Sequence, residues 1–120
     1  MELINLTPHA VTLHGELGSV TLPKGLGPFP RLETIRYPMA PVVVGGVILP
    51  VKCVVILGEV RDLPAPTEGV VFVVSAMVEA ACPKRSDLYS PGELLRNGDG
   101  TIIGAYGLSR SGQSQMEERF

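Results

Sequence analysis

The chain has 120 residues, a net charge of −2 and 45 % hydrophobic residues. A chain of this length has room for one domain, and its composition is that of globular proteins rather than disordered ones. Because the net charge is small, no strong field attracts nucleic acid or an anionic membrane, so we expect neither as a partner. The sequence predicts one domain at residues 1–110 and a flexible tail at residues 111–120, with fraying from Ser109 onward.

The N-terminal stretch MELINLTPHA lacks the basic and apolar segments of a signal peptide. The most apolar region, residues 41–57, is interrupted by Gly45-Gly46, Pro50 and Lys52, which excludes a membrane helix of about 20 apolar residues. We therefore expect the protein in the cytoplasm of its host cell. The two cysteines, Cys53 and Cys82, show no zinc-site spacing, and we interpret both as buried free thiols.

Frequent glycine and proline residues favour short strands joined by tight turns. Residues 2–6 and 10–14 are predicted as the first two strands, joined in a hairpin by the Thr7-Pro8-His9 turn. Residues 20–22 are predicted to form a short strand, whereas the prolines of residues 23–30 are expected to prevent regular structure.

The middle of the chain predicts longer strands. Residues 31–37 alternate imperfectly, which indicates a bulge. Gly45-Gly46 fits a two-residue hairpin turn, because glycine tolerates the positive φ angles that such a turn needs. Residues 51–59 are apolar on both faces near residues 54–57, so we expect burial under a helix or in a subunit interface.

One helix is predicted, at residues 75–82. Ser75 can cap its start and Pro83 stops it, and we expect Glu79 to face outward. A loop at residues 61–69 and a buried strand at residues 70–74 precede it. A hairpin follows, with its turn at Asn97-Gly98-Asp99-Gly100. The predicted fold class is α+β: a small, mostly antiparallel β-sheet domain with one short helix packed on it, which forms oligomers.

The oligomer is predicted from surplus apolar surface. The apolar strands at residues 42–57 and 70–74 exceed what one small sheet and one helix can cover. We therefore expect part of this surface to be an obligate subunit interface, with a binding pocket across it.

No catalytic or metal-binding constellation stands out. Both histidines lie in the first predicted hairpin, no serine lies in a G-x-S-x-G motif, and the acidic residues are scattered. We therefore predict no catalytic residue, no metal and no cofactor. His9, with Thr7 beside it, either donates to a ligand phosphate or base or is only part of the turn.

The arginines are the more informative residues. Five of them lie at predicted strand ends or in loops: Arg31, Arg61, Arg85, Arg96 and Arg110. A guanidinium matches phosphate oxygens with two parallel hydrogen bonds. Either each is a solvated surface charge or at least two converge on one anion. Tyr89 and Tyr106 are candidate platforms for a purine ring, or structural aromatics.

Several segments together suggest a family: INLTPH at residues 4–9, RLET at 31–34, GEVRDLP at 58–64, EGVVFVVSAMVEAACPKRSDLYSPG at 68–92 and LRNGDGTIIGAYGL at 95–108. With them the chain resembles small proteins of bacteriophages and prophages, and it is similar to the anti-Thoeris phage proteins. Those proteins sequester cyclic ADP-ribose isomers, made by bacterial TIR-domain immune enzymes, without cleaving them. They form dimers that associate into hexamers, and some also hold cyclic oligonucleotides.

The resemblance implies a phage anti-defence protein that binds a cyclic nucleotide signal, is not an enzyme, and forms a homo-oligomer: a dimer, and a hexamer built as a trimer of dimers. Arginines would hold the phosphates, an aromatic ring the adenine, and polar side chains the ribose hydroxyls. The residues of those types are Thr7, His9, Arg31, Arg61, Arg85, Tyr89, Arg96, Asn97 and Arg110. Two alternatives stay open: a phosphodiesterase or nucleotidase with His9 as acid or base, and a phage structural or adaptor protein.

Overall fold

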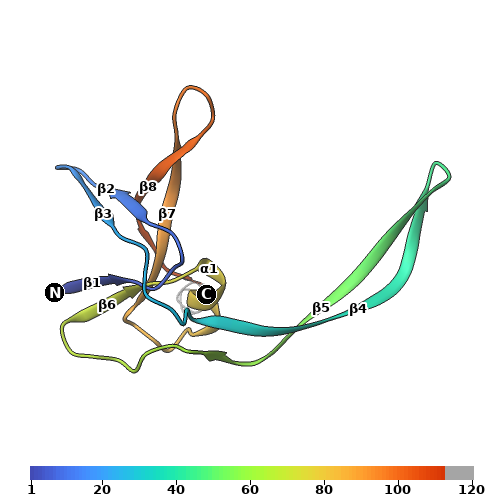
Figure 1. Cartoon of the computed structure of the whole chain (residues 1–120), viewed down its shortest axis with the longest axis horizontal. Helices are drawn as coiled ribbons and strands as arrows, with labels where there is room; N and C mark the ends of the chain where they lie inside the picture. The colour runs from blue at the N-terminus through green and yellow to red at the C-terminus, as the bar shows by residue number, and fades with distance from the viewer. Residues whose placement is uncertain (113–120) are drawn as a thin grey trace, which may run out of the picture.

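The computed structural model describes residues 1–112 and has two parts, a head of sheet and helix and a long two-stranded arm (Figure 1). The arm consists of β4 (Arg31–Val44) and β5 (Val47–Arg61). The head contains β1 (Glu2–Asn5), β2 (Val11–His14), β3 (Ser19–Leu22), β6 (Val70–Val73), α1 (Ala76–Ala81), β7 (Leu88–Arg96) and β8 (Ile102–Ser109). The molecule measures 55 × 39 × 39 Å along its principal axes.

The six strands of the head form one mixed sheet in the order β1-β6-β7-β8-β2-β3. The pairs β1–β6, β6–β7 and β2–β8 are parallel, and β7–β8 and β2–β3 are antiparallel. The α+β class with one short helix is confirmed. The expectation of a mostly antiparallel sheet holds for the arm and for β7–β8 and β2–β3, but the head sheet is mixed, since three of its five strand pairs are parallel. The crossover through α1 explains part of the difference, because it lets β6 and β7 run in the same direction.

The predicted hairpin around Thr7-Pro8-His9 was also wrong. β1 lies at one edge of the sheet beside β6, whereas β2 lies between β8 and β3 near the other edge. The triplet therefore belongs to a connection that crosses between two parts of the sheet. Both strands pair with segments far away in sequence, which local alternation of apolar residues cannot indicate.

The Asn5 side chain organises this connection. Asn5 is 5 % exposed. Its amide nitrogen donates to the carbonyls of His9 at 2.8 Å and Pro23 at 3.0 Å, and its amide oxygen accepts from the Thr7 backbone at 2.9 Å and the Thr7 hydroxyl at 2.6 Å. These bonds compensate the cost of burying the amide.

The core of the head lies between the sheet and α1. Phe72, Val74, Val78 and Leu88 form it, each at most 4 % exposed. The predicted buried strand at residues 70–74 is thus confirmed, and α1 covers it within the chain. The surplus apolar surface that was expected to include this strand lies instead on the arm.

Helix α1 has its predicted cap, because the Ser75 hydroxyl oxygen accepts from the Val78 amide at 3.3 Å. The expected orientation of Glu79 was wrong: Glu79 is 4 % exposed, whereas Met77 is 58 % exposed. A Glu79 carboxylate oxygen accepts from the Ser111 amide at 2.6 Å. A hydrogen bond to a segment distant in sequence thus stabilises the buried carboxylate. A helix of six residues is too short for its hydrophobic periodicity to indicate that Glu79 points inward.

The β7–β8 hairpin has the predicted turn, in which the Asn97 side-chain oxygen accepts from the amides of Asp99 and Thr101 at 2.9 and 3.1 Å. The expected fraying was wrong for residues 109–111, since β8 includes Ser109 and both Arg110 and Ser111 form hydrogen bonds with the head. The rest of the predicted tail, residues 113–120, lies outside the described residues.

The arm turns at Gly45-Gly46, whose φ angles are 56° and 78°, as the sequence predicted. Its ladder shifts register between Leu32 and Glu33 and again between Met39 and Val42. The first shift lies opposite the predicted irregular segment, but the unpaired residues, Gly58 and Glu59, belong to β5, so the bulge expected within residues 31–37 was wrong. Within the single chain, the expected burial of residues 51–59 was wrong, because Val54 and Ile56 are each 52 % exposed. Burial of this segment in a subunit interface stays a prediction.

Cys53 lies on the arm and Cys82 follows α1. Both are free thiols, as expected, but each is only partly buried. In the part of the chain that the structure describes, no helix has the length and apolar composition needed to cross a membrane.

Candidate functional site

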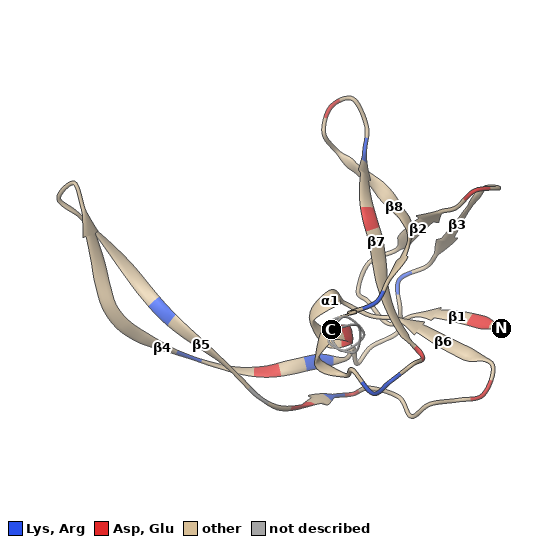
Figure 2. Cartoon of the chain, turned by 180° about the vertical axis from the view of Figure 1, so that it is seen from behind, with Lys and Arg blue, Asp and Glu red and all other residues tan. Residues whose placement is uncertain are grey.

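The nine predicted ligand residues occupy four separate places on the fold. Thr7 and His9 lie in the connection after β1, Arg31 and Arg61 at the root of the arm, Arg85, Tyr89 and Arg110 at the corner between α1 and β7, and Arg96 and Asn97 at the outer end of the β7–β8 hairpin. The hairpin and the arm project from the head in different directions (Figure 1). The basic residues are correspondingly spread over the molecule (Figure 2).

Thr7 and His9 act mainly within their own loop. The Thr7 hydroxyl lies 2.6 Å from the Asn5 amide oxygen, and the His9 carbonyl accepts from the Asn5 amide nitrogen at 2.8 Å. The His9 side chain is exposed and borders a hollow of about 420 Å³ between β2, β7 and β8. The other lining residues are apolar apart from Thr12: Ala10, Val11, Pro91, Leu94, Ile102, Ile103, Gly104 and Ala105.

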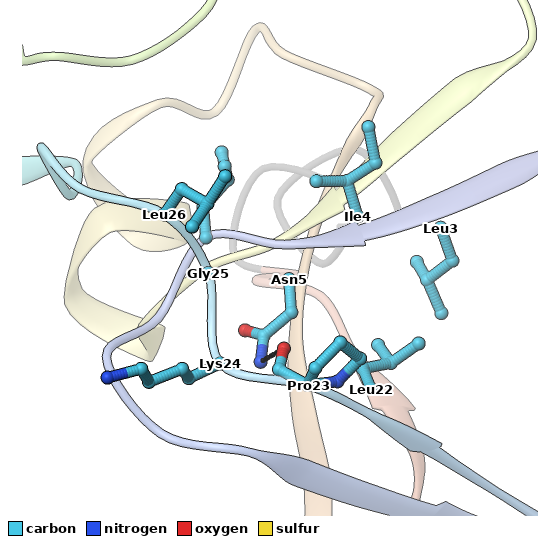
Figure 3. Close-up of a pocket in the computed structure, with 9 residues that line it drawn as sticks. Leu3, Ile4, Asn5, Leu22, Pro23, Lys24, Gly25 and Leu26 are labelled. Carbon is cyan, nitrogen blue, oxygen red and sulfur yellow. Dashed lines mark hydrogen bonds between the residues drawn. The ribbon is translucent and has the colours of Figure 1, made fainter.

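Figure 3 shows a second hollow, of about 340 Å³, beside the same loop. Leucines, Ile4 and the Pro23–Gly25 segment line it, with Asn5 hydrogen-bonded to the Pro23 carbonyl. The Lys24 ammonium points away from the Asn5 amide (Figure 3). Because all polar groups of Asn5 are already paired, this hollow offers a ligand few polar contacts.

At the corner between α1 and β7, the arginine side chains form hydrogen bonds with other groups of the same chain. The Arg85 guanidinium forms two hydrogen bonds with Asp87, at 2.8 and 2.9 Å, and a third with the Pro64 carbonyl at 2.9 Å. Hydrogen bonding to Arg85 lowers the pKa of the Asp87 carboxyl. These bonds use most of the donors that Arg85 would offer to a phosphate.

Arg110 closes the same corner. It donates to the carbonyls of Arg85 at 3.2 Å and Leu88 at 2.9 Å, and its guanidinium lies 5.4 Å from the centre of the Tyr89 ring. One face of Tyr89 is therefore already occupied by a cation, so a purine could stack only on the other. Nearby, burial raises the pKa of the Cys82 thiol, which disfavours the thiolate that a nucleophile requires.

At the hairpin end, the Arg96 guanidinium donates to the Gly100 carbonyl at 2.9 Å, and Asn97 supports the turn. At the arm root, Arg31 and Arg61 are direct cross-strand partners. Arg61 forms a salt bridge with Glu33 at 2.9 Å, in which both side chains are about half exposed. No hydrogen bond or salt bridge occupies the Arg31 guanidinium within residues 1–112.

Among the hollows described above and lined by residues 1–112, the one at the arm root is best suited to an anion. Its volume is about 300 Å³, and it lies between β4 and the start of α1. Its lining combines two arginines and two hydroxyls with apolar side chains: Pro30, Arg31, Leu32, Thr34, Arg36, Ser75, Met77 and Val78. The Ser75 oxygen accepts from Val78, so its hydroxyl proton remains available to a ligand.

An apolar groove of about 290 Å³ adjoins this hollow. Leu32 and Met77 line both, and Ile56, Ala80 and Ala81 complete the groove. A cationic hollow beside an apolar groove matches a ligand that has phosphates at one end and a flat ring at the other. We call the two together the arm-root site.

Sequence reasoning missed Arg36. In a regular strand Arg31 and Arg36 would point to opposite faces, because they are five residues apart. Leu32, Thr34 and Arg36 share one face by the regular alternation of β4 and line the hollow together, and Arg31, at the start of the strand, lines it as well. The spacing of Leu32, Thr34 and Arg36 by two residues was the available signal, but it did not indicate that α1 would lie beside this face.

The chain matches no protein-family model, no curated protein and no solved structure. Similarity to the anti-Thoeris phage proteins therefore stays a prediction from the sequence motifs.

Proposed function

We propose that this protein binds and sequesters a phosphorylated cyclic nucleotide without cleaving it, at the arm-root site. The ligand class is that of the cyclic ADP-ribose isomers, with cyclic oligonucleotides as a further class. In this proposal the protein is a phage anti-defence protein in the host cell cytoplasm, and its homo-oligomer is a dimer that assembles into a hexamer.

The observation that carries the proposal is the position of Arg31 and Arg36 on one hollow beside an apolar groove. Two guanidiniums can each bind a phosphate, while Leu32, Ile56 and Met77 offer a flat ring an apolar contact. The hydroxyls of Thr34 and Ser75 are suited to ribose hydroxyls. Arg85 and Arg110 serve the fold in this proposal, because Nε and Nη2 of Arg85 and Nη1 of Arg110 donate to groups within the chain.

Sequestration without cleavage is tested by measuring whether intact ligand is released when the protein is denatured by heat. The purified full chain is incubated with a cyclic ADP-ribose isomer, separated from unbound ligand, heated, and the supernatant analysed by chromatography. Intact ligand in stoichiometric amount supports the proposal. A cleaved product supports the phosphodiesterase or nucleotidase alternative, and absence of ligand contradicts both.

Matched variants locate the site. Arg36→Ala should weaken binding by about tenfold to a hundredfold, which corresponds to roughly 1.4–2.8 kcal/mol. Lys52→Ala is the control, because Lys52 is an exposed cation of the same arm and does not line the hollow. Equal affinities of the two variants would remove the arm root from the site.

A second candidate function, a structural or adaptor protein that only assembles, is favoured by the exposed apolar side chains of the arm. Val43 is 63 % and Ile48 67 % exposed at its tip. Exposed apolar patches of this extent are typical of interaction surfaces. This candidate predicts oligomers and no retained nucleotide, so the release experiment separates it from the first.

A further inference from the structure

The arm has two unlike faces. In an antiparallel ladder, directly opposite residues point to the same side, and the side alternates from one pair to the next. Between residues 35 and 55 one side carries only apolar and aromatic side chains, and we call it the apolar face; at the arm root the Glu33–Leu57 pair continues the same side. Its ten residues form five cross-strand pairs: Ile35–Val55, Tyr37–Cys53, Met39–Val51, Val42–Leu49 and Val44–Val47.

Within residues 34–56 the opposite face carries the charges. Arg36 pairs with Val54 and Lys52 with Pro38, and these two cations are the only charged residues between residues 34 and 56. The arm is therefore amphipathic across its thickness, although its sequence is apolar nearly throughout.

The second bulge preserves this segregation. Between the pairs Met39–Val51 and Val42–Leu49, β4 advances by one residue more than β5. The additional residue restores the alternation, so that Val42 and Val44 share a face with Met39. Contact across one pair supports the assignment, because a hydrogen bond with the Cys53 side chain raises the pKa of the Tyr37 phenol.

The apolar face is uncovered within residues 1–112. Eight of its ten residues are between 37 % exposed, at Val55, and 60 % exposed, at Val44, whereas Val51 and Cys53 are partly buried. For residues of these sizes the exposed surface amounts to roughly 800 Å², which is about what one partner contributes to a standard interface. An isolated two-stranded ribbon is also only marginally stable in water, so the arm needs a covering partner.

We infer that the apolar face of the arm packs against the same face of a second copy of this chain. Its ten residues are uncharged and, apart from the Tyr37 hydroxyl, apolar, so the face is complementary to itself, as a two-fold interface requires. Such packing leaves Arg36 and Lys52 on the outer side, where they stay hydrated. The inference specifies the partner surface of the proposed oligomer, and it is independent of whether a nucleotide binds.

Two adjacent valines provide the matched test. Val42 lies on the apolar face and Val43 on the opposite face, and they are 50 % and 63 % exposed. Val42→Glu should raise the dimer dissociation constant of the full chain at least a hundredfold in analytical ultracentrifugation, because a carboxylate would be buried against apolar side chains. Val43→Glu should change it less than threefold. Equal effects, or the reverse order, would overturn the inference.

A second pair tests the arm nearer its root. Val55→Glu, on the apolar face, should dissociate the dimer, whereas Val54→Glu should leave it intact. Unchanged thermal melting of the head would show that each variant folds. A wild-type chain that is monomeric at tens of micromolar yet retains the cyclic nucleotide would contradict the proposed dimer interface but not the proposed ligand function. A dimer that retains no nucleotide would contradict only the proposed ligand function.

Discussion

Gly25 lies directly against the backbone of Asn5. A Cβ atom at residue 25 would collide with the Asn5 carbonyl oxygen, and the Gly25 amide donates to the Thr7 carbonyl at 2.9 Å. This contact fixes the irregular segment after β3 on the loop that follows β1. The contact explains why residue 25 is a glycine, although neither a turn nor a positive φ angle requires one there.

Gly25→Ala should therefore destabilise the head by about 2–4 kcal/mol, because the obstructing atom belongs to the backbone and cannot move aside alone. Chemical denaturation followed by circular dichroism measures the loss. Gly98→Ala is the control, since a Cβ at residue 98 meets no atom within 4 Å. A loss at residue 25 no larger than that of the control would contradict the close approach.

Replacing Asn5 should be similarly costly. Asn5→Ala leaves the carbonyls of His9 and Pro23 without their donor, and we expect a loss of about 2–3 kcal/mol. Asn5→Asp should lose at least as much at neutral pH, because a carboxylate oxygen would then face those two carbonyls. Urea titrations of both variants measure the losses. If Asn5→Asp were as stable as the wild type, the hydrogen-bond assignment of the amide would be wrong.

The Arg85–Asp87 pair predicts a pH dependence. Hydrogen bonding to Arg85 lowers the pKa of Asp87 in the folded state, so the unfolded chain binds more protons at acidic pH. The stabilisation is complete above the ordinary carboxyl pKa and disappears as the pH falls through the lowered folded-state pKa. Denaturation of the wild type and of Asp87→Asn across this range measures it. The stability difference between them should shrink with acidification, and a constant difference would contradict the prediction.

Arg110→Ala separates fold from ligand binding. The variant loses the hydrogen bonds to the carbonyls of Arg85 and Leu88 and the contact with Tyr89, so we expect a loss of about 1–3 kcal/mol in unfolding free energy. Its affinity for the cyclic nucleotide should stay within about threefold of the wild type at a temperature where it is folded, a factor worth roughly 0.7 kcal/mol. Calorimetric titration beside Arg36→Ala measures this. A larger loss of affinity for Arg110→Ala than for Arg36→Ala would move the site to the corner between α1 and β7.

Local signals in the sequence were sufficient to predict the helix, two of the turns and one buried strand. Ser75 and Pro83 delimited the helix, Gly45-Gly46 and Asn97 marked their turns, and the apolar run at residues 70–74 indicated a buried strand. Each of these depends on neighbouring residues only.

Strand pairing could not be predicted in the same way. β1 pairs with β6 across more than sixty residues, and nothing in the Thr7-Pro8-His9 triplet distinguishes a hairpin turn from a crossing connection. The orientation of Glu79 depends on an amide at residue 111 for the same reason. At the candidate site, residue types suggested arginines, but only the position of the start of β4 beside α1 determines that Arg36 and Arg31 line one hollow.

The arm begins and ends at a single point, because Arg31 and Arg61 are direct cross-strand partners. Its length is therefore decoupled from the head: adding or removing matched pairs between these two residues changes the reach of the ribbon without altering any strand connection in the six-stranded sheet. A shortened chain, with residues 33–59 replaced by a tight turn, should retain the folded head. The ribbon is in this sense an insertion, whose length can vary while the architecture that carries it stays the same.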